Sequence, residues 1–183
     1  MDKLKYSLIL LLILTSCSAK KTVIFTRELH QKVIDFGLDL EDIQFYNSHK
    51  IVLRRTLSFE QAKVASGKIR FENGQYIESI IIKKNTPGIL EHGDDKSLDI
   101  AFESGENRQL SFVRNPKDHY QVSAQEWVKK MGKVPYDTTV YYILPGGEKS
   151  LLKVRQEDIF RFKKKERIVT GRTVSIRKPT DDE

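Results

Sequence analysis

The densest group of side chains capable of chemistry in this sequence spans five adjacent positions. It reads Glu91, His92, Gly93, Asp94 and Asp95. Carboxylates beside an imidazole can bind a hard cation or tune a general base. The spacing lacks the fixed alternation of oxygen ligands and the distant glutamate of an EF-hand loop. A solvated turn between two strands gives the same composition, so both interpretations stay open.

A basic segment near the end of the chain is the second candidate. If it is extended, Arg161, Lys163 and Lys165 share one face, while Phe160 and Phe162 point to the other. Such a row could bind anionic lipid headgroups or glycan phosphates. Lysines on an edge strand also prevent edge-to-edge aggregation, and a row of charges is equally compatible with ordinary solvated surface.

The only tryptophan, Trp127, precedes a smaller basic group of the same kind. That group consists of Lys129, Lys130 and Lys133. The indole could be a platform for a carbohydrate or peptide, or it could pack against its apolar neighbours. Composition alone favours packing.

No catalytic signature accompanies these candidates. The histidines are His30, His49, His92 and His119, and no two of them have the spacing of paired metal ligands. The sequence contains neither a nucleophile elbow nor a glycine-rich phosphate loop. The sequence therefore does not support an enzymatic activity, and we expect no metal and no cofactor.

The only cysteine, Cys17, lies three positions after the end of an apolar run. Lys3 and Lys5 precede the uninterrupted run 8–14, and this order is typical of a secretory signal. The run is too short to span a bilayer, which takes about 20 apolar residues. After Cys17 there is no cysteine for an internal disulfide, a nucleophile or a metal site.

The four residues Leu14-Thr15-Ser16-Cys17 resemble the lipobox of bacterial lipoproteins. This resemblance implies a diacylglycerol on the Cys17 thiol, cleavage just before Cys17, and acylation, for example with palmitate, of the new amino terminus. Ser18 stands where an aspartate would favour inner-membrane retention, so the resemblance favours the outer membrane. Lys20 and Lys21 replace the acidic tract of surface-exposed lipoproteins, which favours the periplasmic face. The rest of the chain resembles no named family.

Loss of residues 1–16 from the 183 leaves 167 and lowers the net charge from +7 to +6. A positive exported protein favours anionic partners, namely lipid, an acidic glycan or an acidic envelope protein, and we expect no nucleic-acid partner. Charged residues make up 31% of the chain, which excludes a polytopic membrane protein.

The elements that position these residues begin with a helix over 26–37. Thr26 can cap it, Leu29, Val33 and Phe36 form one apolar stripe, and Gly37 ends it. The capping-box spacing of Ser58 and Gln61 predicts a second, short helix through Val64.

From about residue 42 the apolar period changes to two, which predicts strands. The expected hairpin-like pairs are 43–47 with 50–55, 69–72 with 76–82, 98–102 with 110–113, 138–144 with 151–154, and 159–162 with 167–169. They predict a mainly β fold, either an antiparallel small barrel or a two-sheet sandwich built of hairpins, with one N-terminal helix. The expected organisation is a signal at 1–16, a lipidated tether at 17–21, one β-rich domain at 22–177 and a disordered tail at 178–183.

The sequence thus favours a non-catalytic binding or structural module, anchored in the cell envelope by lipid. One alternative is a barrel that carries a small apolar or amphipathic ligand. Another is an envelope hydrolase with a site assembled from scattered histidines and carboxylates.

We predict that Cys17→Ala abolishes lipidation and moves the protein from the membrane to the soluble fraction, because the thiol is the only attachment point. Metabolic labelling with palmitate and membrane fractionation measure both effects. Ser16→Ala, which keeps the thiol, is the control. Membrane association and lipid label that survive in Cys17→Ala would disprove the anchor.

Overall fold

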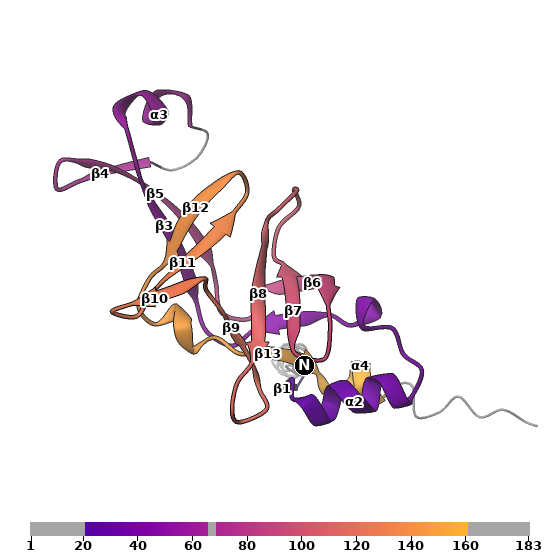
Figure 1. Ribbon diagram of the computed structural model, residues 1–183. Coiled ribbons are helices and arrows are strands. Elements are labelled where there is room, and N and C mark those ends of the chain that lie inside the picture. Colours follow the sequence, from indigo (N-terminus) through magenta and orange to yellow (C-terminus); the bar gives the residue numbers. More distant parts are fainter. Residues whose placement is uncertain (1–20, 66–68, 161–183) are drawn as a thin grey trace, which may run out of the picture.

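The computed structural model describes residues 21–65 and 69–160 (Figure 1). Cys17, Arg161, Lys163 and Lys165 lie outside these ranges, so their roles stay predictions. Among the described residues, no helix is both long and apolar enough to cross a membrane.

The first of two antiparallel sheets has seven strands, in the order β1-β13-β2-β6-β7-β8-β9. The strands are β1 (Thr22–Ile24), β2 (Phe45–Asn47), β6 (Pro87–Gly93), β7 (Ser97–Ala101), β8 (Gln109–Arg114), β9 (Tyr120–Val122) and β13 (Leu152–Arg155). Its inner face carries fully buried side chains, among them Phe45, Ile100, Phe112 and Val154.

The second sheet has six strands, in the order β10-β11-β12-β3-β5-β4. The strands are β3 (Ile51–Leu57), β4 (Ile69–Glu72), β5 (Gln75–Ile82), β10 (Glu126–Val128), β11 (Met131–Tyr136) and β12 (Thr139–Ile143). Leu53, Ile143 and Tyr136 extend the buried core from this side.

The seven-stranded sheet curls until its last strand approaches its second. The Val122 amide donates to the Ser150 carbonyl at 2.9 Å, and Gln121 forms an isolated bridge with Leu151. No continuous ladder joins these strands among the described residues, so the sheet is not a closed barrel. The expected mainly β, antiparallel architecture is confirmed, and two packed sheets fit the sandwich rather than the barrel.

Helix α2 (Arg27–Asp35) packs beside β9. The Thr26 hydroxyl accepts the Leu29 amide at 3.2 Å, as expected of an N-cap. His30 and Val33 face the core, while the Phe36 side chain is 45% exposed. The N-terminal helix is therefore confirmed, although Phe36 does not extend its buried stripe.

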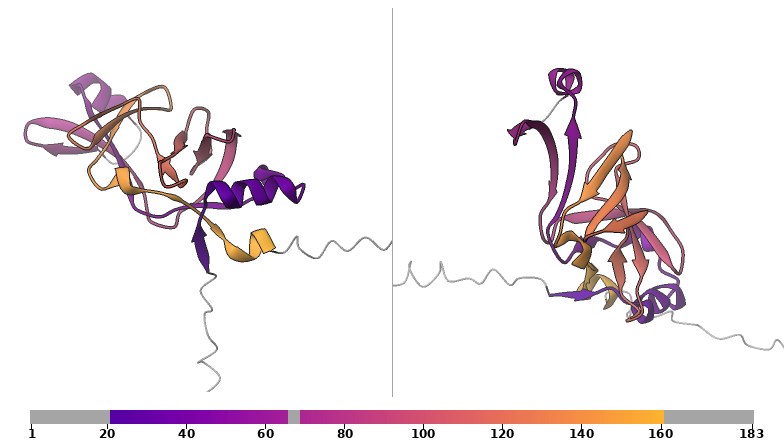
Figure 2. Two further views of the ribbon diagram at one scale, coloured as in Figure 1. Left: turned by 60° about the horizontal axis from the view of Figure 1, so that its bottom comes forward. Right: turned by 60° about the vertical axis from the view of Figure 1, so that its left-hand side comes forward.

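Strands β3, β5 and β4 extend away from the body as an arm, which helix α3 (Phe59–Val64) completes (Figure 2). The predicted capping box is present, since the Ser58 and Gln61 side chains each bond the other residue's backbone amide. Asn73 and Gly74, with φ values of 48° and 79°, form the predicted tight turn between β4 and β5. The predicted pairing of β7 with β8 is also confirmed.

Two predicted hairpins are wrong. Strand β12 pairs with β11 and β3, whereas β13 pairs with β1 and β2 in the other sheet. Likewise β2 and β3 belong to different sheets. The turn before β13 contains the short 3-10 helix η2 (Gly147–Lys149), so the chain crosses between sheets there instead of reversing.

The predicted strand starting at Ile159 is also wrong, and the described residues contain one more α-helix than the two predicted from sequence. Of the three α-helices in the part of the chain that the structure describes, the last, α4 (Gln156–Phe160), occupies the start of that strand. Glu157 and Asp158 lie in its first turn, where the helix dipole favours negative charge. Ile159 is buried and anchors the helix on the core.

A fully buried asparagine, Asn47, holds two crossovers between the sheets together. Its side-chain nitrogen donates to the carbonyls of His49 and Lys83 at 2.6 and 2.8 Å. Its side-chain oxygen accepts the Thr86 amide at 2.8 Å. One side chain thereby satisfies backbone groups of both the β2–β3 and the β5–β6 connections, which have no ladder partners there.

We predict that Asn47→Ala lowers the free energy of unfolding by about 3 kcal/mol, because it removes three hydrogen bonds that one fully buried side chain makes with the backbone. Urea unfolding followed by far-UV circular dichroism measures the change. Gln44→Ala is the control: it removes an amide that donates to the Gly88 carbonyl from a half-buried position, and should cost about 1 kcal/mol. Equal losses in the two variants would contradict the role of Asn47.

Candidate functional site

The acidic cluster and His92 form a solvated turn. Glu91 and His92 lie at the end of β6, and Asp94 and Asp95 lead into β7 with exposed side chains. The Asp94 carboxylate accepts the amides of Lys96 and Ser97 at 2.8 and 2.7 Å, which lowers its pKa. Within residues 21–65 and 69–160, no three histidine, cysteine or acidic side chains gather as metal ligands.

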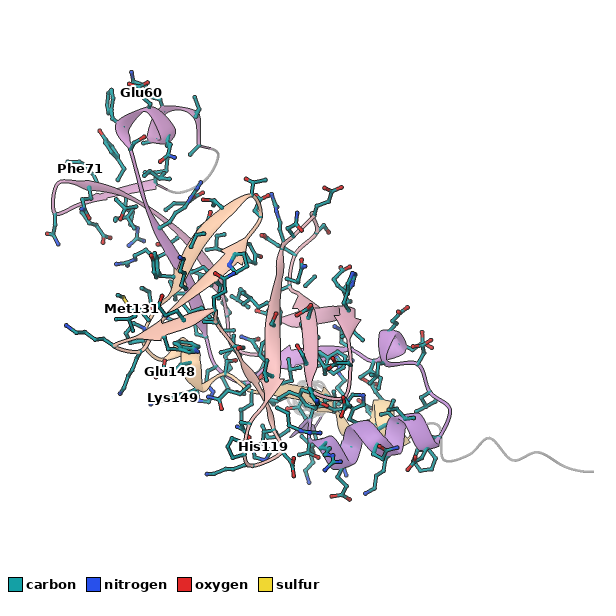
Figure 3. All side chains as sticks on the ribbon, viewed as in Figure 1. Glu60, Phe71, His119, Met131, Glu148 and Lys149 are labelled. Carbon is teal, nitrogen blue, oxygen red and sulfur yellow. The ribbon has the colours of Figure 1, made fainter. Side chains whose placement is uncertain are left out.

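The four histidines are also scattered, and Figure 3 shows His119 far from the arm. His49 contacts the Ser48 hydroxyl at 2.8 Å, but Ser48 is buried and its oxygen accepts the Leu151 amide. That serine is therefore held by the backbone rather than poised as a nucleophile. His30 is a buried residue of α2 and contacts the Tyr120 hydroxyl of β9.

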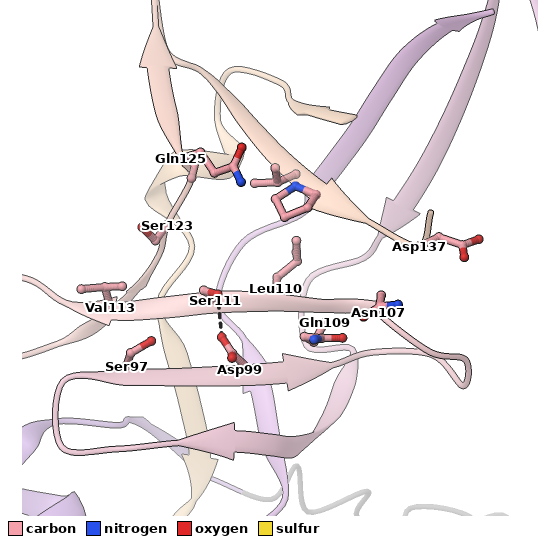
Figure 4. A pocket seen from close by; sticks show the side chains of 13 residues that line it. Ser97, Asp99, Asn107, Gln109, Leu110, Ser111, Val113, Ser123, Gln125 and Asp137 are labelled. Atoms are coloured by element: carbon pink, nitrogen blue, oxygen red, sulfur yellow. Dashed lines mark hydrogen bonds between the residues drawn. The ribbon is translucent and has the colours of Figure 1, made fainter. Parts of the chain in front are cut away.

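A groove of about 610 Å³ lies where the two sheets meet (Figure 4). Its floor is the outer face of β7 and β8, because Leu98, Ile100, Leu110 and Phe112 alternate toward the core. The outward positions include Ser97, Asp99, Gln109 and Ser111. Asp99 and Ser111 are directly opposite each other, and the hydroxyl donates to the carboxylate at 2.6 Å.

The wall of the groove is the segment that passes from β9 to β10. The Ser123 amide donates to the Ser111 carbonyl at 2.8 Å, and the Gln125 amide donates to the Lys133 carbonyl at 2.9 Å. These two bonds attach the same short segment to both sheets. The separation between floor and wall is therefore fixed by backbone hydrogen bonds.

The groove is lined mainly by polar side chains, and most of them lack a hydrogen-bond partner among the described residues. Its lining has three serine hydroxyls, three amides and two carboxylates. Five of these side chains form no hydrogen bond within the described residues: Ser97, Asn107, Gln109, Ser123 and Gln125. They remain available to water or to a ligand.

A second cavity, of about 490 Å³, lies between the arm and the body, and its charged side chains pair with neighbours in the same lining. The Glu78 carboxylate accepts from Arg55 at 2.5 Å and from the Tyr141 hydroxyl at 2.9 Å. Burial, together with this bond to Glu78, raises the pKa of Tyr141 to about 12. Tyr136 donates in the same way to Glu103, at 2.9 Å. These bonds hold the β11–β12 hairpin to its neighbours and leave the carboxylates occupied.

Neither the acidic turn nor Trp127 lines the groove, and the groove residues were not singled out from sequence. Period-two alternation could have identified the outward faces of 97–99 and 109–111. Nothing local in the sequence indicates that segment 123–125 crosses over them, since that depends on how the two sheets pack.

We predict that, because of His30, the free energy of unfolding decreases as the pH is lowered below about 6.5. Burial lowers its folded-state pKa, so below the unfolded value of about 6.5 the unfolded chain binds a proton that the folded chain does not. His30→Gln should flatten the dependence of the free energy of unfolding between pH 7.5 and 5.5, measured by urea titration. The exposed His92→Gln should keep the wild-type dependence, and a flattening there instead would contradict the assignment.

The described residues therefore form an open polar groove where backbone hydrogen bonds join the two sheets, separate from their histidines and from the acidic turn. No family model, curated protein or solved structure matches this chain.

Proposed function

We propose that this protein is a lipid-anchored binding module of the cell envelope, and that the polar groove beside β8 is its ligand site. The observation that carries the proposal is the set of five unpartnered polar side chains on a backbone-fixed groove. The lipobox resemblance at Cys17 supports the anchor and an outer-membrane location facing the periplasm.

The ligand chemistry that fits this lining is neutral, rich in hydroxyls and amides, and extended. Serine hydroxyls and side-chain amides donate and accept in turn, as sugar hydroxyls and acetamido groups require. The groove's charged groups, Asp99 and Asp137, already accept from Ser111 and Arg108. We therefore favour an N-acetylated glycan over an anionic ligand for this site.

The two other functions considered from sequence receive less support. A hydrolase would need a nucleophile and a base within reach of each other, and the groove's lining contains serines but no histidine, lysine or cysteine. A carrier would need an interior cavity. The body interior is instead packed with aromatic rings. The ring centroid of Phe25 lies 5.2 Å from that of Phe45, in an edge-on contact, and 5.5 Å from that of Tyr120.

The test is a titration of the leaderless chain with a soluble N-acetylglucosamine oligosaccharide, followed by NMR. We expect saturable shifts of the Gln109 and Gln125 side-chain amides and of backbone amides at 97–99 and 123–125. Gln109→Ala with Gln125→Ala should weaken binding about tenfold, because each lost hydrogen bond contributes about 0.5–1.5 kcal/mol.

Gln75→Ala is the matched control, because it removes the same group from an exposed position on the arm. Its affinity should equal that of the wild type. The absence of saturable shifts at millimolar ligand, or shifts confined to other elements, would refute the groove as a glycan site. Release of shortened oligosaccharides would favour the hydrolase instead.

A further inference from the structure

The hairpin of β10 and β11 ends in an unusual turn. Lys129 and Lys130 have φ values of 47° and 66°, so both occupy the left-handed region. Val128 pairs with Met131 across them, which makes this a two-residue hairpin turn. Asparagine and glycine are the residues preferred at such positions. The two lysines therefore place positive charge at the tip, at positions where asparagine and glycine would fit the left-handed backbone better.

The same tip exposes apolar side chains. The exposed fractions are 39% for Trp127, 51% for Val128 and 40% for Met131, and Figure 3 shows Met131 pointing outward. The Trp127 ring lies directly over Gly132, where only a glycine leaves room for it, since a Cβ at that position would lie 2.7 Å from the ring. The indole therefore packs against the glycine and is partly exposed beside the turn.

The tip carries a net positive charge. Lys129, Lys130 and Lys133 accompany a single acidic residue, Glu126. None of the three lysines forms an ion pair within the described part of the chain. The tip thus combines free cations with exposed apolar groups, and tryptophan with lysine is typical of surfaces that lie in the bilayer interface.

The end of the arm differs in this respect. Phe59 and Phe71 are also exposed, at 55% and 66%. However, Lys63 pairs with Glu60 at 3.5 Å, and Arg54 pairs with Glu72 at 3.8 Å. Arg70, beside Phe71, forms no ion pair among the described residues, so the arm carries one such cation where the hairpin tip carries three.

We propose that the β10–β11 tip binds the surface of an anionic lipid bilayer, with the lysines among the headgroups and Val128 and Met131 at the acyl boundary. Lysine is depleted at protein–protein interfaces, so a membrane suits this surface better than a protein partner. The inference is independent of the glycan groove and of a lipid on Cys17.

The experiment uses residues 18–183, which lack the leader and Cys17 but keep every described element. The probes are phosphatidylcholine vesicles with and without phosphatidylglycerol. Because Trp127 is the only tryptophan, its emission reports directly on the tip. We expect a blue shift with anionic vesicles, none with neutral vesicles, and loss of binding as salt screens the exposed charges.

The decisive variant is Lys129→Asn with Lys130→Gly, because it removes two charges while installing the preferred turn residues. Its partition onto anionic vesicles should weaken roughly 30-fold, at about 1 kcal/mol per charge. Its stability should be equal or higher. Lys83→Gln with Lys84→Gln is the matched control: it removes two exposed charges from the β5–β6 connection and should bind within about twofold of the wild type.

Three outcomes would overturn the proposal. The first is equal binding to neutral vesicles. The second is undiminished binding of the Lys129→Asn, Lys130→Gly variant. The third is sedimentation with vesicles without any change in Trp127 emission, which would assign the contact to another surface, such as the basic row at Arg161, Lys163 and Lys165.

Discussion

The fold depends on how the chain passes between its two sheets, and Asn47 is the group on which those passages converge. Strand ladders satisfy backbone polar groups inside each sheet, but a crossover has no ladder. Two crossovers meet at one buried amide, which bonds to backbone groups on both sides of it. The arm therefore joins the body at a fixed point, although its far end makes few contacts with it. A third passage, through residues 123–125, is fixed by backbone bonds to both sheets.

Local signals in the sequence predicted local structure well. The Thr26 cap, the Ser58 capping box and the Asn73–Gly74 turn each depend on residues within four positions, and each forms as expected. Sheet membership could not be predicted in this way. Residues 145–147 have turn composition, yet β12 and β13 separate there because each finds partners far away in sequence. The groove was missed for the same reason, since its wall and floor meet only after the sheets pack.

Strand β11 belongs to both proposed surfaces. Val134 and Pro135 line the groove, while Met131 lies at the tip of the same hairpin. Tyr136, at the strand's other end, is fixed by its bond to Glu103. A ligand in the groove and a bilayer at the tip would thus contact opposite ends of one short, well-anchored strand. The four histidines and the acidic turn lie elsewhere: His30 packs in the core, and Asp94 bonds backbone amides of its own turn.

The pairing of β1 with β13 joins nearly opposite ends of the described chain, since Thr22 is opposite Arg155. Strand β2 needs the same partner, with Asn47 opposite Leu152. Strands β1 and β2 therefore cannot complete their pairing until β13 is present. Contacts between residues so far apart in the sequence form slowly, because the long loop between them must close first. A chain emerging amino terminus first cannot complete this sheet until residue 155 is available. The topology therefore delays completion of the seven-stranded sheet until most of the described chain has been synthesised.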